Sequence, residues 1–330
     1  MADNPGKTIT VDEVLAGIEL GGKRALVTGV SSGIGAATAQ ALVARGTAVV
    51  GTARDLVKAE KALGVLREAA KSTGAFEMLE LDLASFASVR ACTNRLAGQG
   101  KPFDLVIANA GVMASPFGLT EDGFETQFGT NHLGHFLLVN RIAPLMRPGG
   151  RLVMLSSSGH RGSDVDLDDP NFEATLYNPW KAYSRSKTAN VLFAVEFDRR
   201  HAPRAIRACA VHPGRVDTEL FRHLGEGGLE GIVDQVDKGR AKQGLPPSHT
   251  KTPAQGAATS VWAAAVASGD EIGGQFCEDC IVSPVNDSEE RLGDIVGVRS
   301  YAVDPERARA LWAKSEEWVG EAFPPPGPAA

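Results

Sequence analysis

The chain is 330 residues long, with 34 basic and 40 acidic side chains and a formal net charge of −6. This length suits one large α/β domain with extensions or two small domains, and scattered charges of both signs argue against a nucleic-acid or anionic-membrane partner. No apolar run reaches the roughly 18–20 residues that span a bilayer, and the N-terminus lacks the layout of a secretion signal, so we expect a soluble cytoplasmic protein.

Short apolar runs alternate with segments of helical length along most of the chain. Residues 1–21 are interpreted as an N-terminal extension with one short helix, "VDEVLAGIEL". The predicted strands that follow are "RALVTG", "AVVGTA", "FEMLEL", "FDLVIANAG", "RLVMLSS" and "IRACAVHPG". Strands that are apolar throughout and separated by helices indicate a parallel sheet covered on both faces. The fold class is therefore α/β, a Rossmann-type doubly wound parallel sheet in a single domain over residues 22–285.

Three segments differ in character from these strands and helices. A polar insertion at residues 159–180 precedes the predicted helix that begins with "AYSRSK". The Gly-rich stretch 215–250 has little apolar periodicity and is predicted to be mobile. These two segments should set substrate specificity. Residues 286–330 form a C-terminal extension with one helix, "DPERARALWAKSEEWVGEAF", and a Pro-rich end that should be disordered.

The first predicted strand is followed by a glycine cluster in a TGxxxGxG pattern. Gly29, Gly33 and Gly35 lie between this strand and a predicted helix. Glycine lets backbone N–H groups approach a diphosphate closely, and a helix N-terminus offers unpaired N–H donors and the positive end of its dipole. A tight turn without a ligand is the alternative, but the place of the cluster between strand and helix favours dinucleotide binding.

The end of the second predicted strand should lie beside the adenosine ribose of such a cofactor. An acidic side chain there favours NAD, whereas a basic one accepts the 2′-phosphate of NADP. In "GTARD", Ala53 takes the position expected for the acid, Arg54 follows, and Asp55 can cap the next helix. We therefore predict a preference for NADP(H) through Arg54. NAD(H) stays open, because a shift of one residue in the strand end would change the assignment.

Polar side chains also close the third and fourth predicted strands. Asp82 could bond the adenine amino group through its carboxylate, or it could cap the following helix. Asn109 begins the sequence "NAG" at the end of the fourth strand. Its side chain either lies close to the cofactor or only fixes the turn.

Cysteine and histidine spacings raise the question of a metal site. Cys277 and Cys280 form "FCEDC", but a zinc site there would need further ligands. His132 and His135 have no acidic or thiol partner nearby in the sequence. We predict no metal site, histidines that serve helix packing, and four reduced, structural cysteines.

Six motifs occur in a characteristic order. They are TGxxxGxG at 28–35, NAG at 109–111, "NHLGHF" at 131–136, a serine run at 156–158, YxxxK at 183–187 and "HPG" at 212–214. With these motifs the chain resembles the short-chain dehydrogenases/reductases over residues from about 22 to 285. "NHLGHF", the polar insertion and "SKTANVLFAVEF" resemble the retinol-dehydrogenase-like branch of that family, although no hydrophobic anchor precedes the first strand.

The resemblance assigns roles to four catalytic residues. On a helix, Tyr183 and Lys187 face the same way, and an ammonium group beside a phenol stabilises phenolate, as does the positive charge of an oxidised nicotinamide. Tyr183 is expected to be the general acid/base, and Lys187 also to bind the nicotinamide ribose. Strand alternation and the family pattern both select Ser157, of three adjacent serines, to hold the substrate oxygen. Asn131 matches the asparagine that organises a water and proton relay to the lysine.

The strand ends and the resemblance together predict the cofactor site. In "HPGRVDT", the backbone near Val216 and the hydroxyl of Thr218 would hold the carboxamide and the diphosphate. The full predicted set is Gly29, Ser31, Ser32, Gly33, Ile34, Gly35, Arg54, Asp82, Leu83, Asn109, Ala110, Gly111, Tyr183, Lys187, Pro213, Gly214, Val216 and Thr218.

The sequence thus predicts an NAD(P)-dependent oxidoreductase that interconverts a secondary alcohol and a carbonyl by hydride transfer. A non-catalytic nucleotide-binding sensor and a redox-neutral epimerase or dehydratase on the same fold are the alternatives. We expect a compact hydrophobic substrate, with Phe117, Trp180 and Phe221 as candidate pocket residues. Either the helices around "HFLLVNRIAPLM" and "ANVLFAVEF" pair between subunits of a homodimer or homotetramer, or the C-terminal extension covers that surface.

Overall fold

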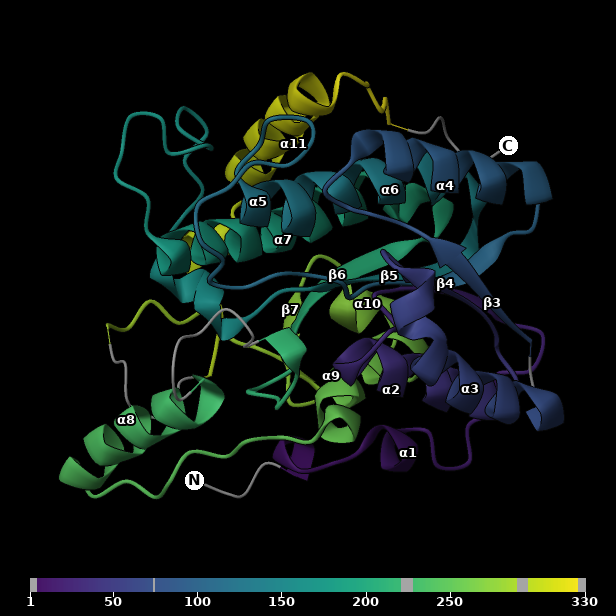
Figure 1. The fold of residues 1–330 in the computed structure, drawn as a ribbon, viewed down its shortest axis with the longest axis horizontal. Coiled ribbons are helices and arrows are strands. Elements are labelled where there is room, and N and C mark those ends of the chain that lie inside the picture. The colour runs from purple at the N-terminus through teal and green to yellow at the C-terminus, as the bar shows by residue number, and fades with distance from the viewer. Residues whose placement is uncertain (1–4, 74, 221–227, 290–295, 326–330) are drawn as a thin grey trace.

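An eight-stranded sheet forms the centre of the protein (Figure 1). The computed structural model describes residues 5–73, 75–220, 228–289 and 296–325. Across the sheet the strand order is β3-β2-β1-β4-β5-β6-β7-β8, and the pairs are parallel except for β7 with β8. The strands are β1 (Arg24–Thr28), β2 (Ala48–Ala53), β3 (Phe76–Glu80), β4 (Phe103–Ala108), β5 (Met146–Leu155), β6 (Arg207–His212), β7 (Phe276–Glu278) and β8 (Ile281–Val282). The predicted doubly wound sheet is confirmed.

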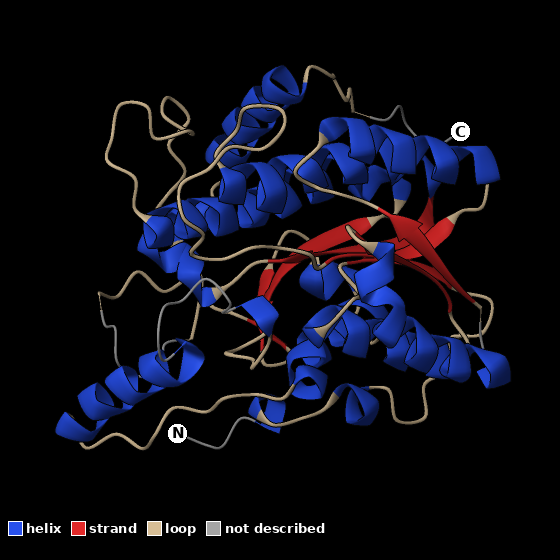
Figure 2. Cartoon of the chain, viewed as in Figure 1, coloured by secondary structure: helices blue, strands red, loops and turns tan. Residues whose placement is uncertain are grey.

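Helices cover both faces of the sheet (Figures 1 and 2). One layer consists of α1 (Val11–Val14), α2 (Gly33–Ala44), α3 (Leu56–Thr73) and α9 (Pro253–Ala265). The opposite layer consists of α4 (Phe86–Gln99), α5 (Thr126–Phe128), α6 (Gly134–Ile142), α7 (Pro179–His201) and α11 (Pro305–Val319). The remaining helices are α8 (Gly228–Lys242) and the short α10 (Gly269–Ile272).

Successive side chains along each strand point to opposite faces of the sheet and belong to two separate apolar cores. Leu26, Val106 and Leu152, on neighbouring strands, belong to the core under α4, α6 and α7. Ala25 and Leu105 belong to the core on the other face. Because both faces are buried, the strands are apolar at almost every position, which is why they were recognisable in the sequence.

The topology creates a crevice at the carboxyl ends of the central strands. β1 and β4 are neighbours in the sheet, but the chain leaves β1 toward α2 in one layer and leaves β4 toward α5 and α6 in the other (Figure 1). Where two adjacent strands send their connections to opposite faces, a ligand-sized opening remains between the loops.

The C-terminal extension packs on the surface formed by α6 and α7. The Trp312 ring lies 5.1 Å from that of Phe136 and 5.6 Å from that of Phe193, centroid to centroid. Ser315 Oγ lies 2.8 Å from Nε2 of the buried His132. The predicted C-terminal helix is therefore present as α11, and it covers the surface that would otherwise be available for subunit pairing.

The stretch 215–250 differs from the predicted mobile segment, because residues 228–242 form the helix α8. This helix lies apart from the sheet (Figure 1). Its sequence places Leu229, Ile232, Val233 and Val236 at helical spacing, a pattern that the surrounding glycines obscured. Glu230 in its first turn and Arg240 and Lys242 in its last turn complement the helix dipole.

Some predictions lie beyond what the structure describes or tests. Phe221 and the last residues of the Pro-rich end lie outside the described residues, and the domain boundaries near residues 21 and 285 stay predictions. Among the helices of the described ranges, none has the length and apolar character needed to cross a membrane.

Candidate active site

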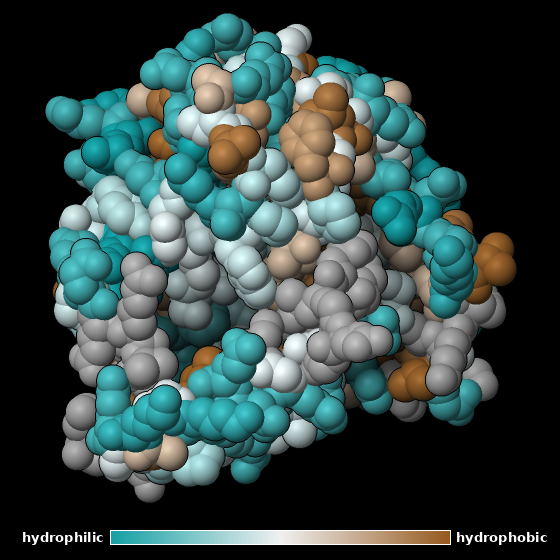
Figure 3. All heavy atoms as spheres, turned by 60° about the vertical axis from the view of Figure 1, so that its left-hand side comes forward, coloured by the Kyte–Doolittle hydropathy of each residue, from teal (hydrophilic) through white to brown (hydrophobic). Residues whose placement is uncertain are grey.

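A cavity of about 1410 Å³ lies along the carboxyl ends of the strands. All of the residues predicted to bind the cofactor line this cavity, and Ser157 lines it too. Asn131 is buried beside it and contacts Val112, which lines the wall. On the face of the molecule that carries α8, the surface of the described residues is mostly hydrophilic (Figure 3).

The turn after β1 requires glycine for close approach. Gly29 has a φ of +73°, and a Cβ added there would lie 2.9 Å from Cβ of Ala110. A Cβ on Gly35 would fall on the carbonyl oxygen of Gly29. The N-cap of α2, Ser32, makes no side-chain capping hydrogen bond, so the first N–H groups of this helix are available to a ligand. A diphosphate fits this cradle of unpaired donors and positive dipole.

A hydrogen-bond network ties β4 to the turn after β1. Asn109 Nδ2 donates to the carbonyl oxygen of Thr28 at 2.8 Å, and the N–H groups of Asn109 and Ala110 both donate to Thr28 Oγ1 at 2.9 Å. His135 completes the network, with Nε2 3.0 Å from Thr28 Oγ1 and Nδ1 3.0 Å from the carbonyl oxygen of Asn131. The Asn109 side chain thus fixes the turn, one of the two roles considered for it.

Arg54 lies at the end of β2 and lines the cavity. It is exposed, and no hydrogen bond or ion pair joins it to another described residue. Asp55 accepts a hydrogen bond from the N–H of Lys58 at 3.0 Å, as predicted for a helix cap.

Asp82 accepts a hydrogen bond from the N–H of Ala84 at 2.9 Å. The N-cap of α4 is Ser85, so the capping alternative for Asp82 is wrong.

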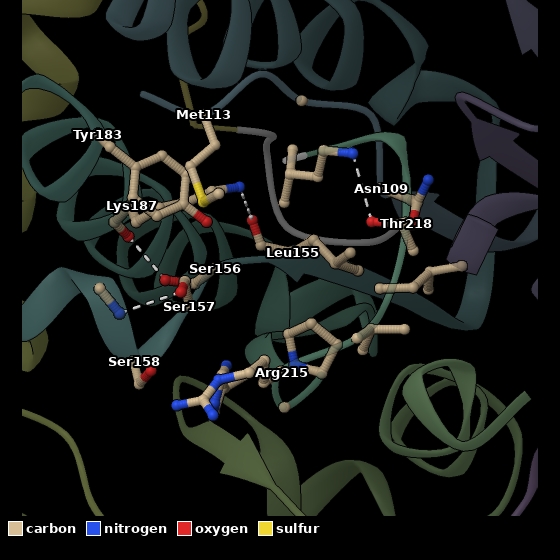
Figure 4. A pocket seen from close by; sticks show the side chains of 18 of the residues that line it. Asn109, Met113, Leu155, Ser156, Ser157, Ser158, Tyr183, Lys187, Arg215 and Thr218 are labelled. Carbon is tan, nitrogen blue, oxygen red and sulfur yellow. Dashed lines mark hydrogen bonds between the residues drawn. The ribbon is translucent and has the colours of Figure 1, made fainter. Parts of the chain in front are cut away.

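Tyr183 and Lys187 project from α7 into the cavity (Figure 4). The helix begins at Pro179, where the side chain of Asn178 accepts hydrogen bonds from two N–H groups of the first turn. Lys187 Nζ donates to the carbonyl oxygen of Leu155 at 3.1 Å and lies 5.7 Å from the centroid of the Tyr183 ring. Both side chains are 5% exposed.

The side chains of Ser156 and Ser157 point in opposite directions, as strand alternation predicts. Ser156 Oγ donates to the carbonyl oxygen of Lys187 at 2.8 Å, so this serine binds α7. Ser157 Oγ accepts a hydrogen bond from the N–H of Gly159 at 3.0 Å (Figure 4). A Cβ on Gly159 would lie 2.8 Å from Cε1 of Tyr183 and 3.3 Å from Ser157 Oγ. Gly159 therefore leaves the space in which phenol and serine meet.

Burial shifts both titrating groups toward their neutral forms. It raises the pKa of Tyr183 to about 12, although the nearby Ser157 hydroxyl acts in the opposite direction. Burial also lowers the pKa of Lys187 to about 8. The lowered tyrosine pKa expected from the sequence is thus absent in the protein alone, because desolvation outweighs the effect of the Ser157 hydroxyl. A positively charged ligand would have to stabilise the phenolate further to lower this pKa.

Asn131 lies in a single π-helical turn, Gly129–Leu133, between α5 and α6. Its Oδ1 accepts from the N–H of Val112 at 2.8 Å, and its Nδ2 donates to the carbonyl oxygen of Val112 and to Ser186 Oγ, both at 2.9 Å. The side chain therefore joins the loop after β4 to α7, close to Lys187. Such π-turns are frequent at functional sites.

Sequence reasoning missed His160, which contacts the backbone of Ser157. Its Nδ1 lies 2.7 Å from the carbonyl oxygen of Ser157, and its Nε2 accepts from the N–H of Arg299 at 3.1 Å. Because Nε2 accepts, Nδ1 must carry the proton that is donated to Ser157. Tyr301 donates its hydroxyl to the carbonyl oxygen of His160 at 2.7 Å. The C-terminal extension thus supports the loop that presents Ser157.

Several cationic side chains in the cavity wall were also missed. Among them are Lys7 in the N-terminal extension, Arg215 after β6, and Lys251 just before α9. Lys251 Nζ pairs with Asp279 at 2.6 Å, and its side chain packs so closely on Gly214 that a Cβ there would lie 2.8 Å from Cδ of the lysine. These residues occur in segments without periodicity, so no local signal could identify them.

No metal centre is formed by the described residues, which contain no cluster of three or more His, Cys, Asp or Glu side chains arranged to hold an ion. The four cysteines are free thiols. His132 packs among aromatic rings of α6 and α7, and burial lowers its pKa to about 3.

The sheet, the glycine turn and the Tyr–Lys pair define a dinucleotide-binding oxidoreductase fold. Residues 29–243 match the sequence model of a family described as enoyl-(acyl carrier protein) reductase. A "Probable oxidoreductase" of Streptomyces lividans is 40% identical over 299 residues, which cover 89% of this chain and 97% of that protein. Retinol dehydrogenase 14 of Homo sapiens is 37% identical over 313 residues, covering 91% of this chain and 87% of that protein.

A solved structure shows the same fold with a cofactor. The structure of a short-chain dehydrogenase from Burkholderia cenocepacia J2315 in complex with NADP is 25% identical, with a TM-score of 0.62, and the match covers 79% of this chain and 97% of that one. The chain belongs to the short-chain dehydrogenase/reductase family of oxidoreductases.

Proposed function

We propose that this protein interconverts a secondary alcohol and a carbonyl compound, with NADP(H) as the preferred cofactor and Tyr183 as the general acid/base. One observation carries the proposal. Tyr183, Ser157 and Lys187 meet in the same cavity that the glycine turn and the end of β2 line at the cofactor-binding edge of the sheet. When bound there, the nicotinamide supplies or accepts the hydride.

Ser157 is suited to hold the substrate oxygen. Its Oγ already accepts a hydrogen bond from Gly159, so its own O–H is directed by that contact and remains available as a donor. A fixed donor aimed at the oxygen stabilises the negative charge that develops there during reduction.

Tyr183 is suited to deliver the proton. With its pKa raised to about 12 by burial, the phenol is protonated at neutral pH, and it donates to the oxygen as the carbonyl becomes an alkoxide. In the oxidative direction the phenol must give up its proton first, which the Lys187 ammonium and a positive cofactor both favour. Asn131 holds the loop after β4 against α7 and so fixes this geometry.

The residues present fit a dinucleotide. The open N-terminus of α2, the glycine contacts and the cavity volume accommodate the diphosphate and its two nucleosides. Gly33, Thr218 and Val216 form the wall beside this helix end. Arg54 supports the choice of NADP(H), since it is exposed at the ribose end. The Burkholderia relative was solved with NADP, and a blue fluorescent protein of the same fold was solved with NADPH.

The test is carbonyl-dependent loss of NADPH absorbance over a panel of ketones, aldehydes and quinones. We expect Tyr183→Phe to lower kcat by at least about 100-fold while NADPH binding, followed by fluorescence, is unchanged. The matched control is Tyr177→Phe, whose hydroxyl binds the carbonyl oxygen of Ser115 at 2.9 Å, away from Ser157. That variant should keep its turnover.

Two outcomes would favour the alternatives. Tight NADPH binding with no turnover on any carbonyl compound would favour a nucleotide-binding sensor. Product formation without net consumption of NADPH would favour an epimerase or a dehydratase. A fully active Tyr183→Phe enzyme would remove the tyrosine from the mechanism.

A further inference from the structure

The side chain of Arg215 lines the same cavity as Ser157 (Figure 4). Its backbone is fixed: the carbonyl oxygen of Arg215 accepts from the N–H of Lys251 at 2.7 Å, and the next residue, Val216, is buried. Figure 4 shows the side chain reaching toward Ser158. Ser157 follows β5 and Arg215 follows β6. Because these two strands are paired neighbours, both residues lie near adjacent strand ends, and they line the same cavity.

The positive charge of Arg215 has no direct carboxylate partner among the described residues. Its Nη1 donates a hydrogen bond to Ser248 Oγ at 2.5 Å, and the Ser248 hydroxyl donates one to Asp237 Oδ1 at 2.7 Å. The Ser248 hydroxyl therefore lies between the Asp237 carboxylate and the guanidinium group. A guanidinium carries five N–H donors, and this contact uses one of them.

Other charges around Arg215 do not remove the need for an anion. Burial lowers the pKa of Arg215; the Asp237 carboxylate behind Ser248 acts in the opposite direction, and the nearby Arg240, which is only 4% exposed, acts in the same direction as burial. Among the carboxylates in the cavity wall, Asp164 pairs with Arg307, Asp279 pairs with Lys251, and Glu278 accepts from Ser283 and from the N–H of Gly297. Holding a partly desolvated cation without a partner is unfavourable, and an anionic ligand would relieve it.

We propose that Arg215 binds an anionic group of the substrate, so that the protein acts on oxo acids and the corresponding hydroxy acids. This inference rests on the proposed function: the reacting oxygen lies at Ser157 and Tyr183, and a carboxylate of the same small molecule lies on Arg215. The planar fork of a guanidinium matches the two oxygens of a carboxylate, and such charge-assisted pairs are strong and directional.

This substrate class replaces the compact hydrophobic one expected from the sequence. Of the aromatic candidates, Trp180 lines the cavity, whereas Phe117 packs edge-on against Tyr177 with ring centroids 5.2 Å apart and is not part of the lining. The cationic side chain of Arg215 in the cavity wall is therefore the better guide to specificity than the apolar loop residues.

The experiment compares each acid with its own methyl ester, because the ester keeps the carbonyl and removes the charge. The probes are acetoacetate and levulinate with their methyl esters, and kcat/KM is measured with NADPH. We expect wild type to prefer the acids, and Arg215→Gln to lower the acid-to-ester ratio by about 10- to 100-fold. Arg215→Lys should lie between the two, since it keeps the charge but loses the fork.

The matched control is Arg147→Gln, an arginine whose side chain is 51% exposed and lies outside the cavity wall. It should leave the ratio unchanged. A wild type that reduces the esters as efficiently as the acids would overturn the proposal. So would an Arg215→Gln variant that binds NADPH more weakly while its acid-to-ester ratio is unchanged, because the guanidinium would then serve the cofactor diphosphate.

Failure of the proposed function gives a different pattern, namely no turnover of any acid, ester or neutral ketone. In that case the anion site is tested by calorimetric titration of levulinate into the NADPH-loaded protein. Weaker binding to Arg215→Gln than to wild type would support the site without any reaction, and equal binding would exclude it.

Discussion

At the scale of single residues, the proposed preference for NADP(H) rests on the residue that follows β2. Arg54 is exposed there, and Asp55 accepts from the N–H of Lys58, so in the proposed complex a cation and not a carboxylate meets the ribose. We expect Arg54→Gln to raise KM for NADPH by about 10- to 100-fold and to change KM for NADH little, because a phosphate contact is lost. Steady-state kinetics with both cofactors measures the effect.

The control for this prediction is Lys58→Gln, which removes an 83% exposed cation from the next helix turn. It should change neither constant. An equal rise for NADPH and NADH in Arg54→Gln would mean that the guanidinium contacts a part common to both cofactors, and the assignment to the 2′-phosphate would be wrong.

We expect His160 to act through Ser157 as a positioning residue. Its ring joins the carbonyl oxygen of Ser157 to the N–H of Arg299. We expect His160→Phe to lower kcat by about 10-fold or more with little change in KM for NADPH, because Ser157 loses its fixed orientation. His160→Gln, which can still donate and accept, should recover part of kcat. Single-turnover rates of reduction report the same loss directly.

A purely structural role would give another result. His201, at the far end of α7, is also buried, and it stacks on Phe197 with ring centroids 4.1 Å apart. His201→Phe should lower stability and leave kcat unchanged. If His160→Phe behaves in the same way, then His160 supports the fold and does not orient Ser157.

At the scale of elements, α11 completes the apolar layer over α6 and α7. Trp312 is 2% exposed and packs on Phe136 and Phe193, while the guanidinium carbon of Arg200 lies 4.1 Å from its ring centroid. We expect Trp312→Ala to lower the free energy of unfolding by about 3–5 kcal/mol, measured by urea denaturation. Trp180→Ala, which removes a 46% exposed ring, should change it by about 0.5 kcal/mol or less.

The same packing bears on self-association. Because α11 occupies the face of α6 and α7, wild type should not pair through that face. Loss of Trp312 exposes part of it, so association that increases with concentration in size-exclusion chromatography should appear in the variant alone. Pairing of the wild-type protein through these helices would contradict the arrangement.

Most elements were predictable because local physics determined them. The strands are buried on both faces and therefore apolar throughout, and the glycine turn is a local motif between β1 and α2. The helix α8 was missed although Leu229, Ile232, Val233 and Val236 follow the i, i+3, i+4, i+7 spacing of a helix, because glycines within and before it suggested a loop. In the site, Ser157 follows from strand alternation, but His160 depends on Arg299, 139 residues away. Contacts of that kind arise only when the chain has folded.

At the scale of the whole molecule, buried histidines make stability depend on pH. Burial lowers the pKa of His132 and His212 to about 3, and of His135 and His160 to about 4, from an ordinary value of 6.5. Between about pH 6.5 and pH 4 the unfolded chain binds protons at these positions that the folded protein does not. The contribution of these histidines to the free energy of unfolding is therefore fully present above pH 6.5 and is lost as the pH is lowered.

Two buried carboxyl groups oppose this trend. Burial raises the pKa of Glu125 and Glu278, so the folded protein takes up protons at these positions before the unfolded chain does, and acid favours the folded state there. With His201, whose pKa burial also lowers to about 4, five histidines outnumber these carboxyl groups. Each contributes on the order of 1 kcal/mol per pH unit within its range. We therefore expect the free energy of unfolding to decrease from pH 7 to pH 5.

Urea denaturation at several pH values measures this slope. His132→Phe offers the sharpest check, because the phenyl ring can occupy the aromatic cluster of α6 and α7 but cannot be protonated in either state. The variant should show a shallower dependence on pH than wild type, whatever its stability at pH 7. A free energy of unfolding that stays constant between pH 7 and pH 5 would mean that these histidines titrate alike in the folded and unfolded chains, and that their interior is accessible to protons.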